Sequence, residues 1–256
     1  GQEIDQIQFS DQLGLKILNL EHNSLQALNI NKLQKLQVIY LEDNPFTAAT
    51  PLMIGRLPNL QVLEVTQIGH ISPSFTLKNF PNLVSFDAYH TVSLTSCDPT
   101  GCPNLRRLSL DMTSVSSVNL SQNPLLEVLN VSDSRIKTLD LSRSSKIKQL
   151  YASHSSGSIN TDVKFDNINV RYCPLLTIFY CDGNNLTNLD LSRNPELFTF
   201  SCARNKLRNL DLTKNTKLYS VNVRYNYLDF VTLPQPGNWF EYYHEQNNLE
   251  VNPTYS

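Results

Sequence analysis

A repeat of about 21 residues runs through most of this 256-residue chain and limits the folds open to it. Each unit opens on a leucine or isoleucine, the anchor, and apolar residues follow three and five places later. Eight of the nine intervals between anchors measure 21 to 24 residues, and one measures 29. A fixed period of this kind indicates stacked units. The ten anchors are Leu15, Leu36, Leu60, Leu83, Leu105, Leu126, Ile147, Leu176, Leu197 and Leu218.

Each unit has two halves that alternate apolar and polar residues. Alternation is the period of a half-buried strand, whereas a helix needs spacings of three and four. The second half also carries Asn, Asp and Thr, which are poor helix formers. We therefore expect one long parallel sheet on one side and short extended or 3₁₀ segments on the other. The place where a helix is most expected is MIGRL, residues 53 to 57.

One unit cannot fold alone. It buries about six apolar side chains at roughly 1.5 to 3 kcal/mol each, against about 1 to 2 kcal/mol of backbone entropy for every ordered residue. Stacked units share a core and need caps at both ends. We expect an N-terminal cap over residues 1–14, a solenoid over 15–233 and a C-terminal cap over 234–256. The tail's aromatic residues could alternatively form a ligand platform; they are Trp239, Phe240, Tyr242 and Tyr243.

The pattern L-x-x-L-x-L-x-x-N, present as LKILNLEHN, LQVIYLEDN and LYSVNVRYN, resembles the leucine-rich repeat family over residues 15 to 233. The 21-residue unit with LDLSRNP and a cysteine at a strand position looks most like bacterial surface repeats related to the internalins. The resemblance implies an α/β-class leucine-rich repeat solenoid, curved and right-handed, with its parallel sheet on the concave face and little α-helix. It also implies a secreted, cell-surface or periplasmic protein without enzymatic activity.

The turn asparagines are expected to bond backbone groups left unpaired between the two halves of each unit. They are Asn23, Asn44, Asn184, Asn205 and Asn226. Repeats five to seven carry Thr113, Ser134 and Ser155 at the matching place, so a less regular turn is expected there.

The outward face of the sheet is the candidate binding surface. Positions two, four and six after each anchor face outward, because successive strand residues point to opposite sides. Exposed tyrosines beside polar groups can anchor proteins or sugars, although an exposed strand also carries such residues for solubility. Together with Glu21, the carboxylates favour a partner with a cationic surface. The predicted ligand-binding residues are Tyr40, Glu42, Glu64, Asp87, Tyr89, Asp111, Tyr151, Tyr180 and Asp182.

Protein binding across this face is the predicted function. A glycan-binding module that uses the tyrosines is the alternative, and a purely structural spacer is a third possibility. No catalytic residue is predicted. Glu64 and Asp87 should lie on neighbouring rungs, about 4.8 Å apart, near the roughly 5 to 5.5 Å carboxyl spacing of retaining glycosidases. A regular sheet nevertheless implies no deep pocket to raise the pKa of a general acid.

Composition excludes several other classes. The formal charge of -2 supplies no cationic surface for nucleic acid, and no apolar stretch approaches the roughly 20 residues that span a bilayer. Because the chain begins at Gly1, any export signal is expected to have been removed. No cofactor or metal is predicted, since the histidines fall in different repeats without ligand spacing. They are His22, His70, His90, His154 and His244.

The 29-residue interval contains YASHSSGSINTDVK, residues 151 to 164, which we expect to leave the rung as a loop. His154 and several serines lie in it, but no motif supplies an acid partner or oxyanion donors for a Ser/His site.

The cysteines are read from their places in the repeat. Cys97 and Cys102 flank the turn DPTG, and a disulfide between them stays open. Cys173 is expected to be a lone buried thiol. Cys181 and Cys202 stand five places after their anchors, where strand spacing of about 4.8 Å exceeds the roughly 3.5 to 4.5 Å between Cβ atoms that a disulfide prefers. We expect both to be core residues.

Overall fold

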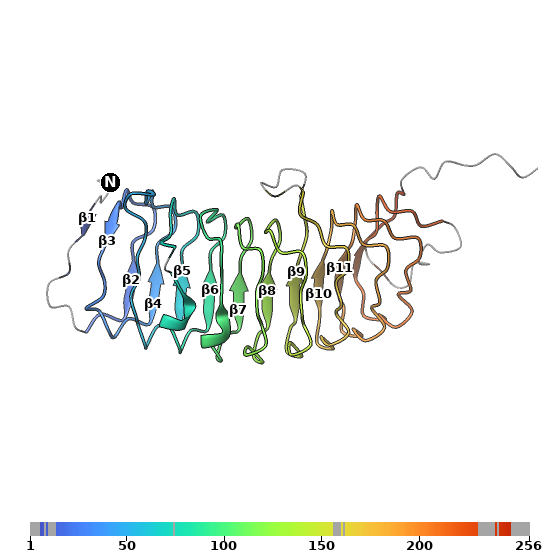
Figure 1. Ribbon diagram of the computed structural model, residues 1–256. Coiled ribbons are helices and arrows are strands. Elements are labelled where there is room, and N and C mark those ends of the chain that lie inside the picture. The colour runs from blue at the N-terminus through green and yellow to red at the C-terminus, as the bar shows by residue number, and fades with distance from the viewer. Residues whose placement is uncertain are drawn as a thin grey trace, which may run out of the picture.

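The computed structural model describes residues 6–7, 9, 14–73, 75–155, 160, 162–229, 239 and 241–246. Within them the chain winds into a solenoid whose turns stack along one axis (Figure 1). Eleven short strands form one sheet, and every neighbouring pair is parallel. The predicted solenoid with a long parallel sheet is confirmed.

The sheet runs in chain order from β2 to β13, with β3 outside it. Its strands are β2 (Ile17–Asn19), β4 (Val38–Tyr40), β5 (Val62–Glu64), β6 (Ser85–Asp87), β7 (Arg107–Ser109), β8 (Val128–Asn130), β9 (Gln149–Tyr151), β10 (Ile178–Tyr180), β11 (Thr199–Ser201), β12 (Ser220–Asn222) and β13 (Glu241–Tyr243). A second small sheet pairs β1 (Gln6–Ile7) with β3 (Ala27–Leu28).

The opposite side of the solenoid is made of extended and 3₁₀ segments, as expected. The two 3₁₀ helices are η1 (Leu77–Asn79) and η2 (Pro99–Gly101), and isolated parallel bridges join Leu52 to Ile71 and Cys97 to Val118. The expectation of a helix at residues 53 to 57 is wrong, because this stretch forms no helix. Leu52 is instead held extended by the bridge to the next rung.

The strands pair without any offset, so equivalent residues of successive repeats stack on one another. From β2 to β12 the central residue of each strand in the long sheet points inward and is buried, as Leu63, Phe86 and Leu108 are, while its two neighbours remain partly exposed in most strands. Phe179 and Phe200 are also in contact, with ring centroids 5.9 Å apart. One continuous core therefore runs along the whole described solenoid.

Buried asparagines close the turns after the strands, as predicted. The Asn205 side chain donates from Nδ2 to the carbonyls of Cys181 and Cys202, at 2.9 and 3.0 Å, and accepts from the N–H of Leu186. Asn44, Asn184 and Asn226 repeat this arrangement. The side chain thus satisfies backbone groups of two successive rungs.

The substituted turns behave differently from one another. The hydroxyls of Thr113 and Ser134 donate to Leu110 O and Val131 O, at 2.7 Å each, and so keep part of the asparagine's role. Ser155 is exposed and bonds Asp133 instead.

A second row of buried asparagines supports the opposite turns. Asn194 donates from Nδ2 to the carbonyls of Val170 and Cys173, at 2.9 and 2.8 Å. Asn123 and Asn215 likewise donate to two backbone carbonyls of the repeat before their own. In the sequence, each of these asparagines can be recognised because it stands three residues before an anchor.

All five cysteines are free and buried. Cys97 and Cys102 form no disulfide, and the Cys102 thiol donates to Leu77 O at 3.3 Å. Burial raises the pKa of Cys102 to about 11 and that of Cys173 to about 12. Cys181 and Cys202 are core residues with no exposed surface, as expected.

Apolar residues near both ends pack on the core. Ile7 and Phe9 lie against it at one end, and Trp239 and Tyr242 at the other, where the two rings contact edge to face at 4.9 Å. We propose that these residues belong to caps, with the domain bounds 1–14, 15–233 and 234–256 as above. Phe240 lies outside the described residues.

Candidate functional site

Residues at the middle of the outward face form one straight row across all eleven strands. Zero register offset places Tyr40 beside Glu64, Glu64 beside Asp87, and Tyr151 beside Tyr180. At about 4.8 Å per strand, Tyr40 and Tyr180 are roughly 29 Å apart. The outward row is Asn19, Tyr40, Glu64, Asp87, Ser109, Asn130, Tyr151, Tyr180, Ser201, Asn222 and Tyr243.

The remaining predicted site residues lie two places further along the chain, just beyond the strand ends. They are Glu42, Tyr89, Asp111 and Asp182. The structure therefore brings all nine predicted residues to one face in two parallel rows, with Tyr89 the most exposed at 38%.

Carboxylates crowd the part of this face that runs from β2 to β7. The pKa of Glu64 is raised, first by desolvation and then by the charge of neighbouring Asp87. Desolvation, followed by the charge of Asp133, raises the pKa of Asp111 to about 6. Among the described residues, none of the predicted carboxylates forms a salt bridge with Lys or Arg. The crowded charges thus form no ion pair, although the nearby charge of Arg107 lowers the pKa of Glu64 slightly against these effects.

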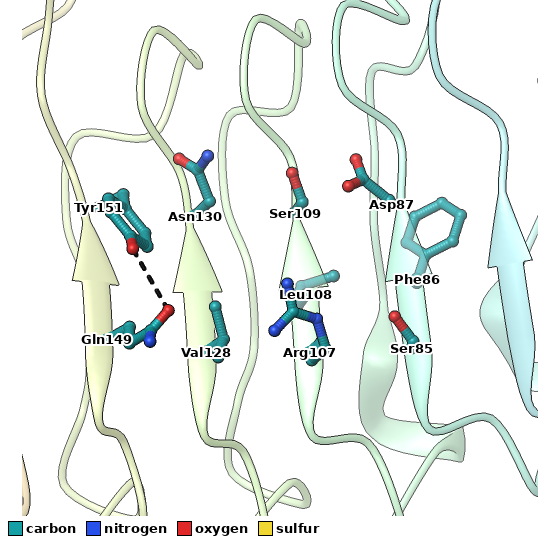
Figure 2. A pocket seen from close by; sticks show the side chains of 10 residues that line it. All are labelled: Ser85, Phe86, Asp87, Arg107, Leu108, Ser109, Val128, Asn130, Gln149 and Tyr151. Atoms are coloured by element: carbon teal, nitrogen blue, oxygen red, sulfur yellow. Dashed lines mark hydrogen bonds between the residues drawn. The ribbon is translucent and has the colours of Figure 1, made fainter. Parts of the chain in front are cut away.

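A hollow of about 160 Å³ lies at the centre of the face, over β6 to β9 (Figure 2). Small side chains at Ser85 and Ser109 leave the space, and Asp87 and Tyr151 stand at its two sides. Arg107 of β7 lines it and is exposed. The sequence reasoning did not single out Arg107, although its place two residues after an anchor marks it as outward.

The two tyrosines beyond the hollow contact each other. Tyr151 and Tyr180 meet edge to face with centroids 5.6 Å apart, and the Tyr151 hydroxyl donates to Gln149 Oε1 at 3.2 Å. Both rings are thereby held in place.

Asp182 accepts more hydrogen bonds than the other predicted carboxylates, of which Glu42, Asp87 and Asp111 accept one each from Gln67, Tyr89 and Asn130. It accepts hydrogen bonds from the Ser201 hydroxyl, from Ser153 Oγ at 3.3 Å and from Ala203 N at 2.6 Å. These bonds act against the desolvation that raises its pKa. Asp182 therefore shapes the face more than it offers a free charge.

The turn residue seven places after each anchor borders the face and was missed from the sequence. In nine of the ten repeats it has a positive φ, for example 55° at Asp43 and 49° at Asp133. Asp43 and Asp133 add carboxylates beside the predicted rows. They stand one position after the last of the three outward positions that were counted from each anchor, which ended at position six.

No protein-family model matches the chain. The adenylate cyclase of Schizosaccharomyces pombe is 27% identical over 197 residues, which is 70% of this chain and 11% of that protein. The matched part is thus a small fraction of the enzyme's length, and it brings no activity to this chain.

Solved structures decide the fold. The functional domain of InlJ from Listeria monocytogenes, which includes a cysteine ladder, is 27% identical with a TM-score of 0.77, over 86% of this chain and 46% of that one. A leucine-rich repeat protein of Leptospira interrogans is 18% identical with a TM-score of 0.64, over 93% and 69% of the two chains. The fold is a leucine-rich repeat solenoid.

Internalin C2 of Listeria monocytogenes is also similar to this leucine-rich repeat solenoid, with 19% identity and a TM-score of 0.58 over 82% of this chain and 81% of that one. The structural neighbours are therefore internalin-like leucine-rich repeat proteins. The chain spans less than half of the InlJ structure that it matches.

The carboxylates Glu64 and Asp87 do not share the central hollow. Glu64 and Asp87 pair in register on the open sheet, and the central hollow includes Asp87 but not Glu64. The described residues contain no group of three His, Cys, Asp or Glu side chains that could hold a metal ion. They also contain no helix that is long and apolar enough to cross a membrane.

Proposed function

We propose that this leucine-rich repeat solenoid is a non-enzymatic interaction module that binds a protein partner across the outward sheet face. The partner presents lysine or arginine side chains to the carboxylates between β2 and β7, and an apolar group to Tyr151 and Tyr180. Stacked repeats of this class form extended sheet surfaces that serve binding.

The observation that carries the proposal is the contrast between two sets of carboxylates. Away from the face, Asp98, Glu127 and Glu196 each pair with a lysine within 2.8 Å. On the face, Glu42, Glu64 and their neighbours have no such cation within the described part of the chain. A cationic partner would supply counter-charges and relieve the repulsion that, after desolvation, raises the pKa of Glu64.

The test needs a partner and a charge-matched control. Proteins captured on the parent chain from surface extracts are purified, and their Kd is measured for the parent and two triple variants. We expect E42Q/E64Q/D87N to weaken binding roughly 5- to 30-fold, because three exposed ion pairs contribute about 1 to 2 kcal/mol. The control D162N/D166N/E196Q changes net charge equally away from the face and should stay within about twofold. Equal losses in both variants would refute a specific acidic site.

Glycan binding remains a second candidate because of the Tyr151 and Tyr180 pair. Its rings lie beside Gln149 and Asp182, so apolar faces and hydrogen-bonding groups occur together. In the same experiment, competition by soluble sugars together with loss of binding in Y151A/Y180A, but not in E42Q/E64Q/D87N, would favour the glycan.

We also propose that the chain acts outside the cell, secreted or attached to a bacterial surface. The support is its likeness to the InlJ domain and to internalin C2 of Listeria monocytogenes. Fractionation of the source organism with an antibody to the solenoid tests the proposal, and a signal confined to the cytoplasm would contradict it.

A further inference from the structure

His154 departs from the turn that every other repeat makes. It stands seven places after anchor Ile147, where the nine other repeats place a residue of positive φ. Its backbone keeps the common pattern, since its N–H donates to Asp182 O at 2.7 Å as Asp133 N–H donates to Ser153 O. Its φ, however, is not positive. The side chain turns inward, and only 2% of it is exposed.

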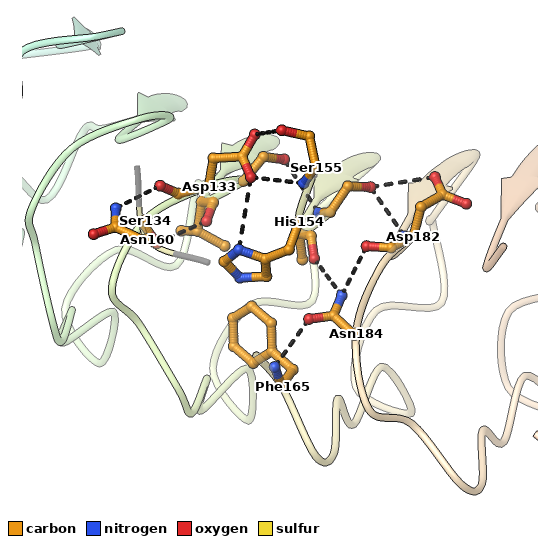
Figure 3. Close-up of polar contacts among 12 residues, drawn as sticks. Asp133, Ser134, His154, Ser155, Asn160, Phe165, Asp182 and Asn184 are labelled. Atoms are coloured by element: carbon orange, nitrogen blue, oxygen red, sulfur yellow. Dashed lines mark hydrogen bonds and ion pairs between the residues drawn. The ribbon is translucent and has the colours of Figure 1, made fainter. Parts of the chain in front are cut away.

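The buried imidazole lacks hydrogen bonds. Neither ring nitrogen has a hydrogen-bond partner within the described part of the chain, and the one charged group near the ring nitrogens in Figure 3 is Asp133, whose Oδ1 lies 3.7 Å from Nδ1, within ion-pair reach if the ring is protonated. The ring packs on Phe165 with centroids 5.9 Å apart. A buried polar group without a partner is rare in native proteins and calls for an explanation.

Asp133 is already engaged by another residue. Its Oδ1 accepts the Ser155 N–H at 2.8 Å and its Oδ2 accepts the Ser155 hydroxyl at 3.0 Å. The Asp133 carbonyl accepts Asn160 Nδ2 at 2.8 Å. Asp133 therefore ties together the rung before the insertion and the residues on both sides of it.

The other charged groups around the ring give it no better partner. Lys164 acts against protonation of His154, and Asp133 favours it. Asp182 faces the turn through its carbonyl, while its carboxylate is held by Ser153, Ser201 and Ala203. Protonation would place a positive charge inside the solenoid beside one carboxylate that is already shared.

We propose that His154 is a built-in acid sensor: neutral and buried at neutral pH, it becomes protonated as the pH falls and opens the turn that Asp133 and Ser155 hold closed. The inference is independent of the proposed partner. The opened turn lies next to Tyr151 and Asp182, so acid alters that end of the outward face.

The direction follows from proton linkage. Desolvation, the largest cause, lowers the pKa of His154 in the closed turn below its ordinary value of 6.5. The opened turn therefore binds more protons than the closed one, and closure weakens as pH falls below about 6.5. Asp111 and Asp182 have raised pKa values, so their protonation stabilises the closed state as pH falls. The histidine and the carboxylates thus predict opposite changes.

Hydrogen exchange of the whole chain at about pH 7.5 and pH 5.5, corrected for intrinsic rates, tests this inference. We expect protection of the His154 and Ser155 amides to fall threefold to tenfold at the lower pH, because one titrating group changes an equilibrium by at most about tenfold per pH unit. His154→Phe should remove this dependence, and His70→Gln, an exposed control, should keep it. A smaller fall in the parent, or an equal fall in His154→Phe, overturns the proposal.

A titration of the unmodified chain guards against a variant that does not fold. The NMR signal of the His154 ring should titrate with a midpoint below 6.5. A midpoint at or above 6.5 overturns the proposal even if the His154→Phe chain is unfolded.

Discussion

Single buried asparagines hold the turns of this solenoid together. Asn205 bonds the backbone of its own rung, of the rung before it through Cys181 O, and of the second half-unit through Leu186 N. An apolar residue of similar size would leave these buried groups without partners.

We expect Asn205→Ala to lower the free energy of unfolding by about 3 kcal/mol, because several buried backbone groups lose their partner at once. Asn188→Ala is the control: Asn188 is exposed and bonds only Thr187 among the described contacts. It should cost less than about 0.5 kcal/mol. Urea denaturation measures both, and similar losses would contradict the role given to Asn205.

Residue types explain what the sequence could predict at this scale. The asparagines and the outward tyrosines recur at fixed places, so their roles could be predicted from counting alone. The inward turn of His154 could not, because it depends on a change of φ in one repeat. The free thiols of Cys97 and Cys102 likewise depend on local backbone directions that spacing leaves open.

The recurring element is a three-residue strand followed by a left-handed turn. His22, Gln67 and Met112 all take a positive φ although they share no chemical feature. The stacked hydrogen bonds of the turn, such as Gln67 N–H to Tyr89 O at 2.8 Å, impose the conformation. The strands could therefore be predicted from their alternation of apolar and polar residues. The turn residue of positive φ could not, because its residue type differs from repeat to repeat. The helix expected at residues 53 to 57 failed for a related reason: Leu52 pairs with the next rung.

Gly183 is the one glycine at this turn and should tolerate replacement badly. Its φ is 71°, and an added Cβ would lie 1.8 Å from the carbonyl oxygen of His154. We expect Gly183→Ala to cost about 2 kcal/mol or more in unfolding free energy. Gln67→Ala is the matched control, because that turn already holds a Cβ at φ 51°. Chemical denaturation of both variants should show the difference, and equal costs would mean that the turn near His154 yields easily.

At the scale of the whole molecule, strand pairing joins each rung only to its neighbours, although Asn160 Nδ2 also donates to Thr113 O two rungs back at 3.0 Å. The sheet has no long-range closure, and its last described strand β13 pairs with β12 alone. The free energy of unfolding is therefore approximately a sum of local contributions along the axis, and a destabilising change at one end affects mainly the rungs near that end. The distribution of charge is equally local: residues 1–129 hold 7 Lys and Arg against 11 Asp and Glu, while residues 130–229 hold 14 against 9.

Removing the Trp239 ring at the C-terminal end tests both the local character of stability and the proposed cap. We expect Trp239→Ala to reduce hydrogen-exchange protection in β12 and then β11, and to leave β4 to β6 unchanged, because Trp239 packs on the core only at that end. Tyr225→Ala, at a turn residue that is 37% exposed, is the control. Uniform loss of protection along the chain would show global cooperativity instead.

The zero offset between strands has a further consequence for how such a chain can change in length. Duplicating or deleting one whole unit moves the two halves of the outward face apart or together by about 4.8 Å and leaves every other pairing intact. The insertion after Ser155 shows the same tolerance, since β9 and β10 pair in full register across it. The length of the outward face is therefore set by the number of units, and a partner of a different length can be matched by adding or removing whole units.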